Sequence, residues 1–291
     1  MTRQERAGWS FAGPVLAVVI AVLLVPAACA FALSLSDFDV YALASVANLR
    51  FIGLTNYAAL FADPAFGRAV LNTTLFALIG VPAAIGASLG AALLLSSATL
   101  RWKPLWRVLL FAPYVTTLVA AATVWRAVLD SRHGLLNAVL HAIGLPAVDW
   151  LGDPRASLPA ILIFVVWKLF GYNMVVFTAA LAAVPDELRD AARLDGAGRW
   201  RRLRHVTLPA IGPVLLLATV LSVAGFVQIF DEPYIMTHGG PAGSTVTLMY
   251  FLFEQGFAWW NLGLASSVAV LLFGATLAFT TVQVRLGRDW T

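Results

Sequence analysis

Long apolar runs separated by short charged segments dominate the pattern of the chain. Six runs carry no charge, or a single lysine: residues 7–36, 69–100, 108–125, 158–184, 206–230 and 255–284. A helix needs about 20 apolar residues to cross the hydrocarbon core of a bilayer. Backbone groups in lipid must pair internally, and the runs lack the alternation of a β-barrel. The pattern therefore predicts an all-α membrane protein with six transmembrane helices, at about 10–35, 69–97, 107–128, 158–184, 207–230 and 261–284.

The composition supports a lipid-facing surface. The chain is 60% hydrophobic and 12% charged, whereas a soluble domain has about half apolar and about a quarter charged residues. The single cysteine, Cys29, excludes an internal disulfide framework and any site with several thiolate ligands. No internal repeat or low-complexity tract divides the chain, so one membrane domain over residues 1–291 is expected.

The first apolar run has two interpretations. Two arginines, an apolar stretch and the sequence PAACA are compatible with a cleaved signal peptide or a lipoprotein site. Its uncharged length of 30 residues exceeds the apolar core of about 7–15 residues that is typical of signal peptides. We therefore expect a retained helix, and N-terminal sequencing of the mature protein separates the two interpretations.

The distribution of basic residues predicts the orientation. If the N-terminus is cytoplasmic, the inner segments hold 13 of the 19 lysines and arginines, and the outer segments hold 5. Such a bias favours both termini on the cytoplasmic side. It also accounts for the net charge of +4 without any nucleic-acid partner.

The segment 185–209 gathers ten of the chain's charged residues, six of them arginines, between the fourth and fifth predicted spans. Pro185 to Gly196 has the signals of a short helix, with acids in its first turn and a glycine stop. One face of that helix is small and mildly apolar, at Leu188, Ala191, Ala192 and Asp195. A charge run of this kind usually fixes topology and contacts anionic lipid, but topology alone requires neither the small face nor an Asp-Gly turn.

The sequence DAARLDGAGRWRRLRHVTLP, residues 190–209, resembles the EAA loop of ABC importer permeases. One triplet is matched by Asp190, Ala191 and Ala192, with Asp in place of the usual Glu, and a closing Leu-Pro pair stands at 208–209. The second triplet is matched by Asp195, Gly196 and Ala197. Stretches at 51–73, 134–137, 150–151, 167–188 and 230–245 resemble other segments of the carbohydrate branch of that family.

The resemblance implies a type I ABC importer permease fold and the role of the first, F-type (sugar A-type) member of a permease pair. In that family the EAA loop is the coupling helix, which docks in a groove of the cytoplasmic ATPase subunit. The implied coupling residues are Leu188, Asp190, Ala191, Ala192, Asp195, Gly196 and Ala197. The implied partners are a G-type permease, a dimer of ATP-binding subunits and an extracytoplasmic solute-binding protein in the bacterial inner membrane. The implied cargo is a carbohydrate or related polyol.

The chain lacks the residues for ATP hydrolysis. Its two lysines, Lys103 and Lys168, are each preceded by tryptophan, so neither fits a phosphate-binding loop. We expect ATP and Mg²⁺ on a separate ATPase subunit and no cofactor on this chain. The four histidines lack metal-ligand spacing, and no pair of carboxylates or nucleophile motif predicts a catalytic residue.

Two groups of residues are candidates for the transport path. In the fourth span Lys168, Tyr172 and Asn173 offer a charge, an aromatic ring and an amide, and ionisable groups inside spans are often functional. The alternatives are a snorkelling lysine and an asparagine that joins helices. Candidates for an outer gate or a binding-protein contact follow the fifth span: Asp231, Glu232, Tyr234, Gly239, Gly240 and Pro241. The alternative for the acids is a solvated helix end before a turn.

Two rival functions remain. An ion-gradient-driven secondary transporter would carry carboxylates inside its spans, whereas the acids here lie at span ends or in loops. An integral membrane enzyme would cluster His, Asp or Cys at one interface, and the sequence has no such cluster.

Overall fold

The computed structural model describes residues 3–39, 49–97 and 99–287. Within these ranges the regular structure is helical, apart from one isolated antiparallel bridge between Ser36 and Phe51, and turns and loops connect the helices. The chain divides into two compact units, Met1–Phe66 with Phe251–Gly274 and Gly67–Tyr250 with Ala275–Thr291. Three helices run from one unit into the other: α5 (Pro64–Ser96), α15 (Leu248–Phe253) and α16 (Leu262–Leu286).

The first unit is built around the end of the first span. Its own elements are α1 (Arg3–Val19), the π-helical turn η1 (Ile20–Leu24), α2 (Val25–Ser34), α4 (Thr55–Ala62) and η4 (Glu254–Ala258). The amide of Asn56 donates to the Ser34 and Ser36 carbonyls at 3.0 and 2.8 Å. The Ser267 hydroxyl of α16 donates to the same Ser34 carbonyl at 3.1 Å. These bonds satisfy carbonyls that the end of α2 leaves free.

The second unit holds the rest of the helices. In chain order they are α6 (Lys103–Val115), α7 (Leu118–Val128), α8 (Leu135–Ala142), α9 (Ser157–Ala182), α10 (Asp186–Leu194), α11 (Arg199–Arg202), η3 (Leu203–Thr207), α12 (Leu208–Ala210), α13 (Gly212–Val227) and α14 (Asp231–Thr237). Two apolar clusters join them. One is centred on Phe76, Phe164 and Phe226, and the other on Met174, Phe177 and Ile211.

Close packing in this unit depends on small residues. A Cβ atom at Gly80 of α5 would overlap the ring of Phe226 in α13. A Cβ at Gly171 of α9 would lie 2.5 Å from the Leu110 carbonyl oxygen of α6. Small residues let membrane helices approach closely where no hydrophobic force between helices is available.

Four helical segments are long and apolar enough to cross a membrane: Phe11–Ser34, Pro64–Ser96, Ser157–Ala182 and Leu262–Leu286. Two further pairs pass the same test together but are bent, α6 with α7 by 99° and the segment Arg199–Ala210 with α13 by 72°. The described part of the chain therefore contains four such helices, or up to six if each bent pair is one span.

The bent pairs differ from the continuous helices that the sequence predicts at 107–128 and 207–230. Thr116 and Thr117 are extended, with ψ of 146° and 141°, and they separate α6 from α7. Ile211 separates α12 from α13, and Pro213 follows at the second position of α13. Proline lacks an N–H and clashes with the carbonyl four residues earlier, which explains the second break.

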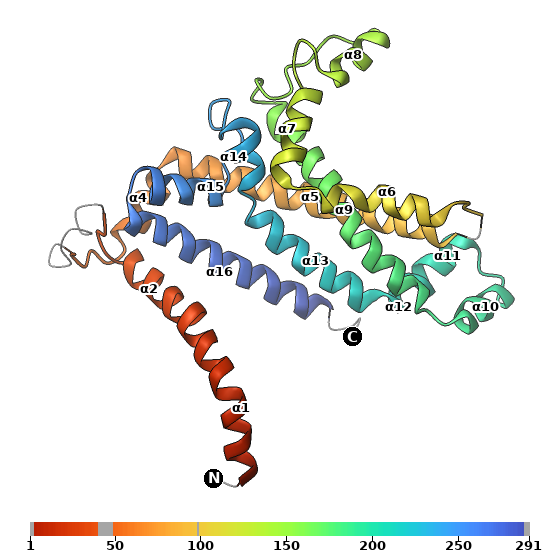
Figure 1. Ribbon diagram of the computed structural model, residues 1–291, viewed down its shortest axis with the longest axis horizontal. Helices are drawn as coiled ribbons and strands as arrows, with labels where there is room; N and C mark the ends of the chain where they lie inside the picture. The colour runs from red at the N-terminus through yellow and green to blue at the C-terminus, as the bar shows by residue number, and fades with distance from the viewer. Residues whose placement is uncertain (1–2, 40–48, 98, 288–291) are drawn as a thin grey trace. The chain divides into compact units, whose positions relative to one another are not determined.

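Within the second unit, α10 and α11 lie at one end of α9, and α7 and α8 lie at the other end (Figure 1). The loops that the sequence assigns to opposite sides of the membrane thus lie at opposite ends of this unit.

Candidate functional site

The segment after α9 folds as the predicted short helix with a sharp end. Pro185 is the N-cap of α10, and Asp186 and Glu187 occupy its first turn. Gly196 has a φ of +72°, and its N–H donates to the Arg193 carbonyl at 3.0 Å. The next N–H, of Ala197, donates to the Ala192 carbonyl at 2.9 Å. These two bonds form the Schellman motif, in which a left-handed residue ends a helix.

The face predicted for partner contact is open in this chain. Leu188 is 50% exposed, Ala191 and Asp195 are exposed, and Ala192 is half-buried. Asp190 forms a 2.8 Å ion pair with Arg193 on the same helix. The small face of α10 is therefore accessible to a partner.

A short series of turns connects α10 to α13. After the glycines come α11, η3 and α12, and the chain then reaches Ile211, which is 1% exposed. Ile211 packs in the same cluster as Met174, Phe177 and Leu181 of α9. Ile211 therefore connects the end of this segment to α9 by direct packing.

Lys168 lies inside the fourth span, and its ammonium group caps the break between α6 and α7. Lys168 is only 8% exposed. Nζ donates to the Thr116 carbonyl at 2.7 Å and to the Pro113 carbonyl at 3.2 Å. Carbonyls at a helix end in lipid have no water to bond with, so the ammonium group supplies hydrogen bonds to them. Its positive charge also interacts favourably with the negative end of the helix dipole.

The three predicted path residues of α9 do not share one site. Tyr172 stacks on Tyr114 of α6 with ring centroids 5.1 Å apart, on the same side of α9 as Lys168. Asn173 is 7% exposed and donates to the Ser222 hydroxyl of α13 at 3.3 Å. Lys168 and Tyr172 thus contact α6, and Asn173 joins α9 to α13.

The helix that follows the fifth span, α14, begins at the two predicted acids. Asp231 is exposed, and Glu232 is half-buried. Burial raises the pKa of Glu232 above its ordinary value, and the neighbouring Asp231 charge adds to the rise. Tyr234 lies among rings, with centroids 5.2 Å from Phe230 and 5.9 Å from Tyr250.

The Gly-Gly-Pro turn after α14 is stabilised by contacts with the residues that follow it in the chain. Gly239 is buried with a φ of +77°, and a Cβ there would lie 2.9 Å from Val246 and 3.2 Å from Tyr250. The Thr245 hydroxyl donates to the Gly240 carbonyl at 2.9 Å. Gly239 and Gly240 therefore act in this structure as packed turn residues, and Pro241 follows through a cis peptide bond.

Two polar side chains near the start of α5, those of Arg68 and Asn72, also bond to this loop. Neither is among the candidates that the sequence predicts. Arg68 donates to the Ala242 carbonyl at 3.1 Å. Asn72 donates to the carbonyls of Gly243 and Val246 at 3.2 and 2.8 Å. The signal that could have found them is the polar pair Asn72-Thr73 near the start of an otherwise apolar span.

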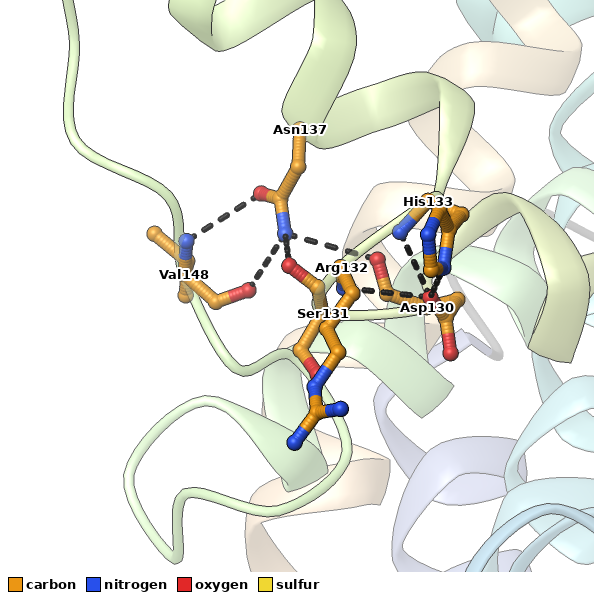
Figure 2. Close-up of polar contacts among 6 residues, drawn as sticks. All are labelled: Asp130, Ser131, Arg132, His133, Asn137 and Val148. Carbon is orange, nitrogen blue, oxygen red and sulfur yellow. Dashed lines mark hydrogen bonds and ion pairs between the residues drawn. The ribbon is translucent and has the colours of Figure 1, made fainter.

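The loop between α7 and α9 is organised by Asn137 of α8 (Figure 2). Its Nδ2 donates to the carbonyls of Asp130, Ser131 and Val148, and its Oδ1 accepts from the Val148 N–H at 3.1 Å. The Trp150 indole donates to the same oxygen at 3.0 Å. This asparagine joins the two short stretches of this loop, 134–137 and 150–151, on which the resemblance partly rested.

Asp130 closes the turn at the start of that loop. Its carboxylate accepts from the backbone N–H groups of His133 and Arg132 at 2.7 and 3.0 Å. These two bonds, with that of His133 the stronger, hold the pKa of Asp130 below its ordinary value.

The long apolar helices define the class of protein, a multi-pass membrane protein. The sequence model described as "Binding-protein-dependent transport system inner membrane component" matches residues 106–290. The chain belongs to this family and is a permease subunit of an ABC importer.

Similar proteins cover nearly the whole chain. The lactose transport system permease protein LacF of Rhizobium radiobacter is 34% identical over 94% of this chain and 91% of its own length. The sulfoquinovosyl glycerol transport system permease protein SmoG of Agrobacterium fabrum is 34% identical over 87% of this chain and 82% of its own.

Among solved structures, the fold is similar to that of a bacterial alginate ABC transporter in complex with alginate pentasaccharide-bound periplasmic protein. The TM-score is 0.82 at 19% identity, over 99% of this chain and 96% of that chain. The two chains therefore share the permease fold.

Proposed function

We propose that this chain forms one half of the translocation path for a carbohydrate or related polyol and couples to an ATPase subunit through α10. The observation that carries the coupling role is the exposed helix of residues 186–194, which ends in a left-handed glycine. The relatives that transport lactose and sulfoquinovosyl glycerol support a carbohydrate cargo.

In this mechanism the ATPase groove holds the face formed by Leu188, Ala191 and Ala192. Closure of an ATP-bound ATPase dimer displaces α10, and the turns through Leu208 and Pro209 carry the displacement to Ile211. Ile211 is buried against both α9 and α13, so the inner ends of two spans move together. ATP and Mg²⁺ belong to the ATPase subunit.

The remaining partners complete the path on either side. A second, G-type permease supplies the other half, and an extracytoplasmic solute-binding protein delivers the cargo to the outer loops. The basic bias of the loops supports cytoplasmic termini and a cytoplasmic α10. The ends of α9 support this arrangement, since α10 and α8 lie at opposite ends of the second unit.

Paired cysteines test both the orientation and the contact. Ala191 of α10 and Ala138 of α8 are both exposed alanines on short helices, and the exposed Cys29 is first replaced by serine. In intact cells an impermeant thiol reagent should label Ala138→Cys and spare Ala191→Cys. In the assembled transporter, only Ala191→Cys should crosslink to the ATPase subunit.

Uptake into vesicles tests the function itself. Vesicles that contain both permeases, the ATPase and the binding protein should take up the cargo only with hydrolysable ATP. Uptake that persists without the ATPase and follows an ion gradient would show that the chain is a secondary transporter instead.

A further inference from the structure

A hollow lined by three arginines lies where α5, α10, α11 and η3 meet. Its volume is about 380 Å³. The lining residues are Leu93, Arg193, Arg199, Arg202, Leu203 and Thr207. They come from the last turns of α5 and α10 and from the segment that leads into the fifth span.

All charged residues of the lining are basic. Three lining residues are arginines, and none is acidic. Arg193 also pairs with Asp190, but both side chains of that pair are more than half exposed, at 64% and 61%, and such pairs contribute little. Arg202 is half-buried, so it lies in the wall rather than on the open surface. An anion is the ligand that this arrangement would attract.

The other walls are apolar and lie at the end of two spans. Leu93 is in the last turn of the membrane-crossing α5, which ends at Ser96. Leu203 and Thr207 begin and end η3, just before the fifth span. On the proposed function, the ends of these spans lie at the cytoplasmic side, where headgroups meet acyl chains.

We propose that this hollow binds an anionic phospholipid, with its phosphate on Arg193, Arg199 and Arg202 and its first acyl carbons on Leu93 and Leu203. The cytoplasmic placement of the site rests on the proposed function; the binding chemistry does not. Planar guanidinium groups bind phosphate oxygens in pairs, and basic pockets at the cytoplasmic ends of spans bind lipid headgroups.

A bound lipid here would tie the coupling segment to the membrane. Arg193 is in the last turn of α10, and Arg199 and Arg202 begin and end α11. One phosphate would therefore connect both short helices to the end of α5. Anionic lipid would stabilise the position from which α10 engages its ATPase partner.

Two arginines two residues apart provide the matched test. Arg202 lines the hollow, and Arg204 is exposed and outside its lining. The assembled transporter is titrated in detergent with phosphatidylglycerol, and bound lipid is counted by native mass spectrometry. Arg202→Gln should weaken binding about fivefold, the usual effect of one arginine near an anionic headgroup, and Arg204→Gln should leave it unchanged. Arg199→Gln is a second variant at an exposed site, should Arg202→Gln fold poorly.

The outcomes separate a lipid site from weaker explanations. Equal losses for Arg202→Gln and Arg204→Gln would show diffuse attraction and overturn the proposal. Displacement of the lipid by soluble glycerol phosphate at equal concentration would show a free-phosphate site and overturn it too. ATP-dependent uptake is measured on the same samples, so a lost lipid site with intact uptake refutes only this proposal.

Discussion

Replacing Lys168 by methionine should destabilise the packing of α6 and α7 on α9. The change keeps the length and the apolar stem of the side chain but removes both donors to Thr116 and Pro113. Hydrogen bonds inside membrane proteins average about 0.6 kcal/mol, and bonds to charged groups contribute about 1.5–3 kcal/mol each. Two bonds at about 0.6–1.5 kcal/mol each give a loss of about 1–3 kcal/mol.

The assay is an equilibrium unfolding titration of the purified permease in mixed micelles, followed by tryptophan fluorescence. Lys168→Arg retains a cation with several donors and should lose less stability than Lys168→Met. Lys103→Met is the matched control, because it removes the only other lysine, at the start of α6. Its unfolding free energy should stay close to that of the unmodified chain.

Two results would refute the capping role. If Lys168→Met were as stable as the unmodified chain, the two carbonyls would not depend on the lysine. If Lys168→Met lost transport at unchanged stability, the lysine would instead act in the transport path.

Four other sites give further predictions. Gly196→Val places a branched residue at a φ of +72°, at a cost above about 1–2 kcal/mol. It should abolish ATP-dependent uptake while the amount of permease in the membrane stays normal. Gly198→Val, at a φ of −63°, should leave uptake intact. Asn137→Ala should speed proteolysis of the loop 129–156, because five hydrogen bonds converge on this side chain. Asn72→Ala should raise hydrogen exchange at 243–248 and leave α10 unchanged. The two backbone amides bonded to Asp130 should stay protected from hydrogen exchange until the pH falls below the usual carboxyl range. The pKa of Asp130 is lowered, so its carboxylate stabilises the turn above that range, and this stabilisation is lost as the pH falls through the lowered pKa.

Each of these has a contradicting result. Equal uptake by Gly196→Val and Gly198→Val would show that coupling does not require the glycine that ends α10. Unchanged proteolysis of Asn137→Ala, or unchanged exchange in Asn72→Ala, would show that other contacts hold those loops. Loss of the Asp130-linked protection near neutral pH would contradict the carboxylate as its acceptor.

The sequence predicted the elements whose signals are local. Apolar runs identified the four helices that are long and apolar enough to cross a membrane, because length and composition alone decide whether a helix fits a bilayer. The helix 186–194 and its stop were also predictable, since Gly196 and the first-turn acids are signals within a few residues of one another. Family membership followed from the same segment and was confirmed by the match over residues 106–290.

The breaks and loop anchors were not predictable, because their causes lie far apart in the chain. Pro113 stands three residues before Thr116, but a proline alone does not predict a 99° bend. The donor that stabilises the bend is 52 residues away. Asn72 and the carbonyl of Val246 are separated by 174 residues. Hydropathy patterns report which residues prefer lipid, whereas these bonds depend on which helices become neighbours.

The charge in the fourth span shows how burial changes the interpretation of a residue. From the sequence, Lys168 was a candidate for the path because a bare cation in lipid is costly. The structure places it against the Pro113 and Thr116 carbonyls at a helix break, of which the first also accepts from the Thr116 hydroxyl at 2.7 Å. The ammonium group and these carbonyls reduce one another's desolvation cost. A span that must bend in lipid needs a donor from a neighbouring helix, and a lysine supplies three donors on one flexible stem. The bend and the buried charge are therefore one feature, and losing either would leave the other unfavourable.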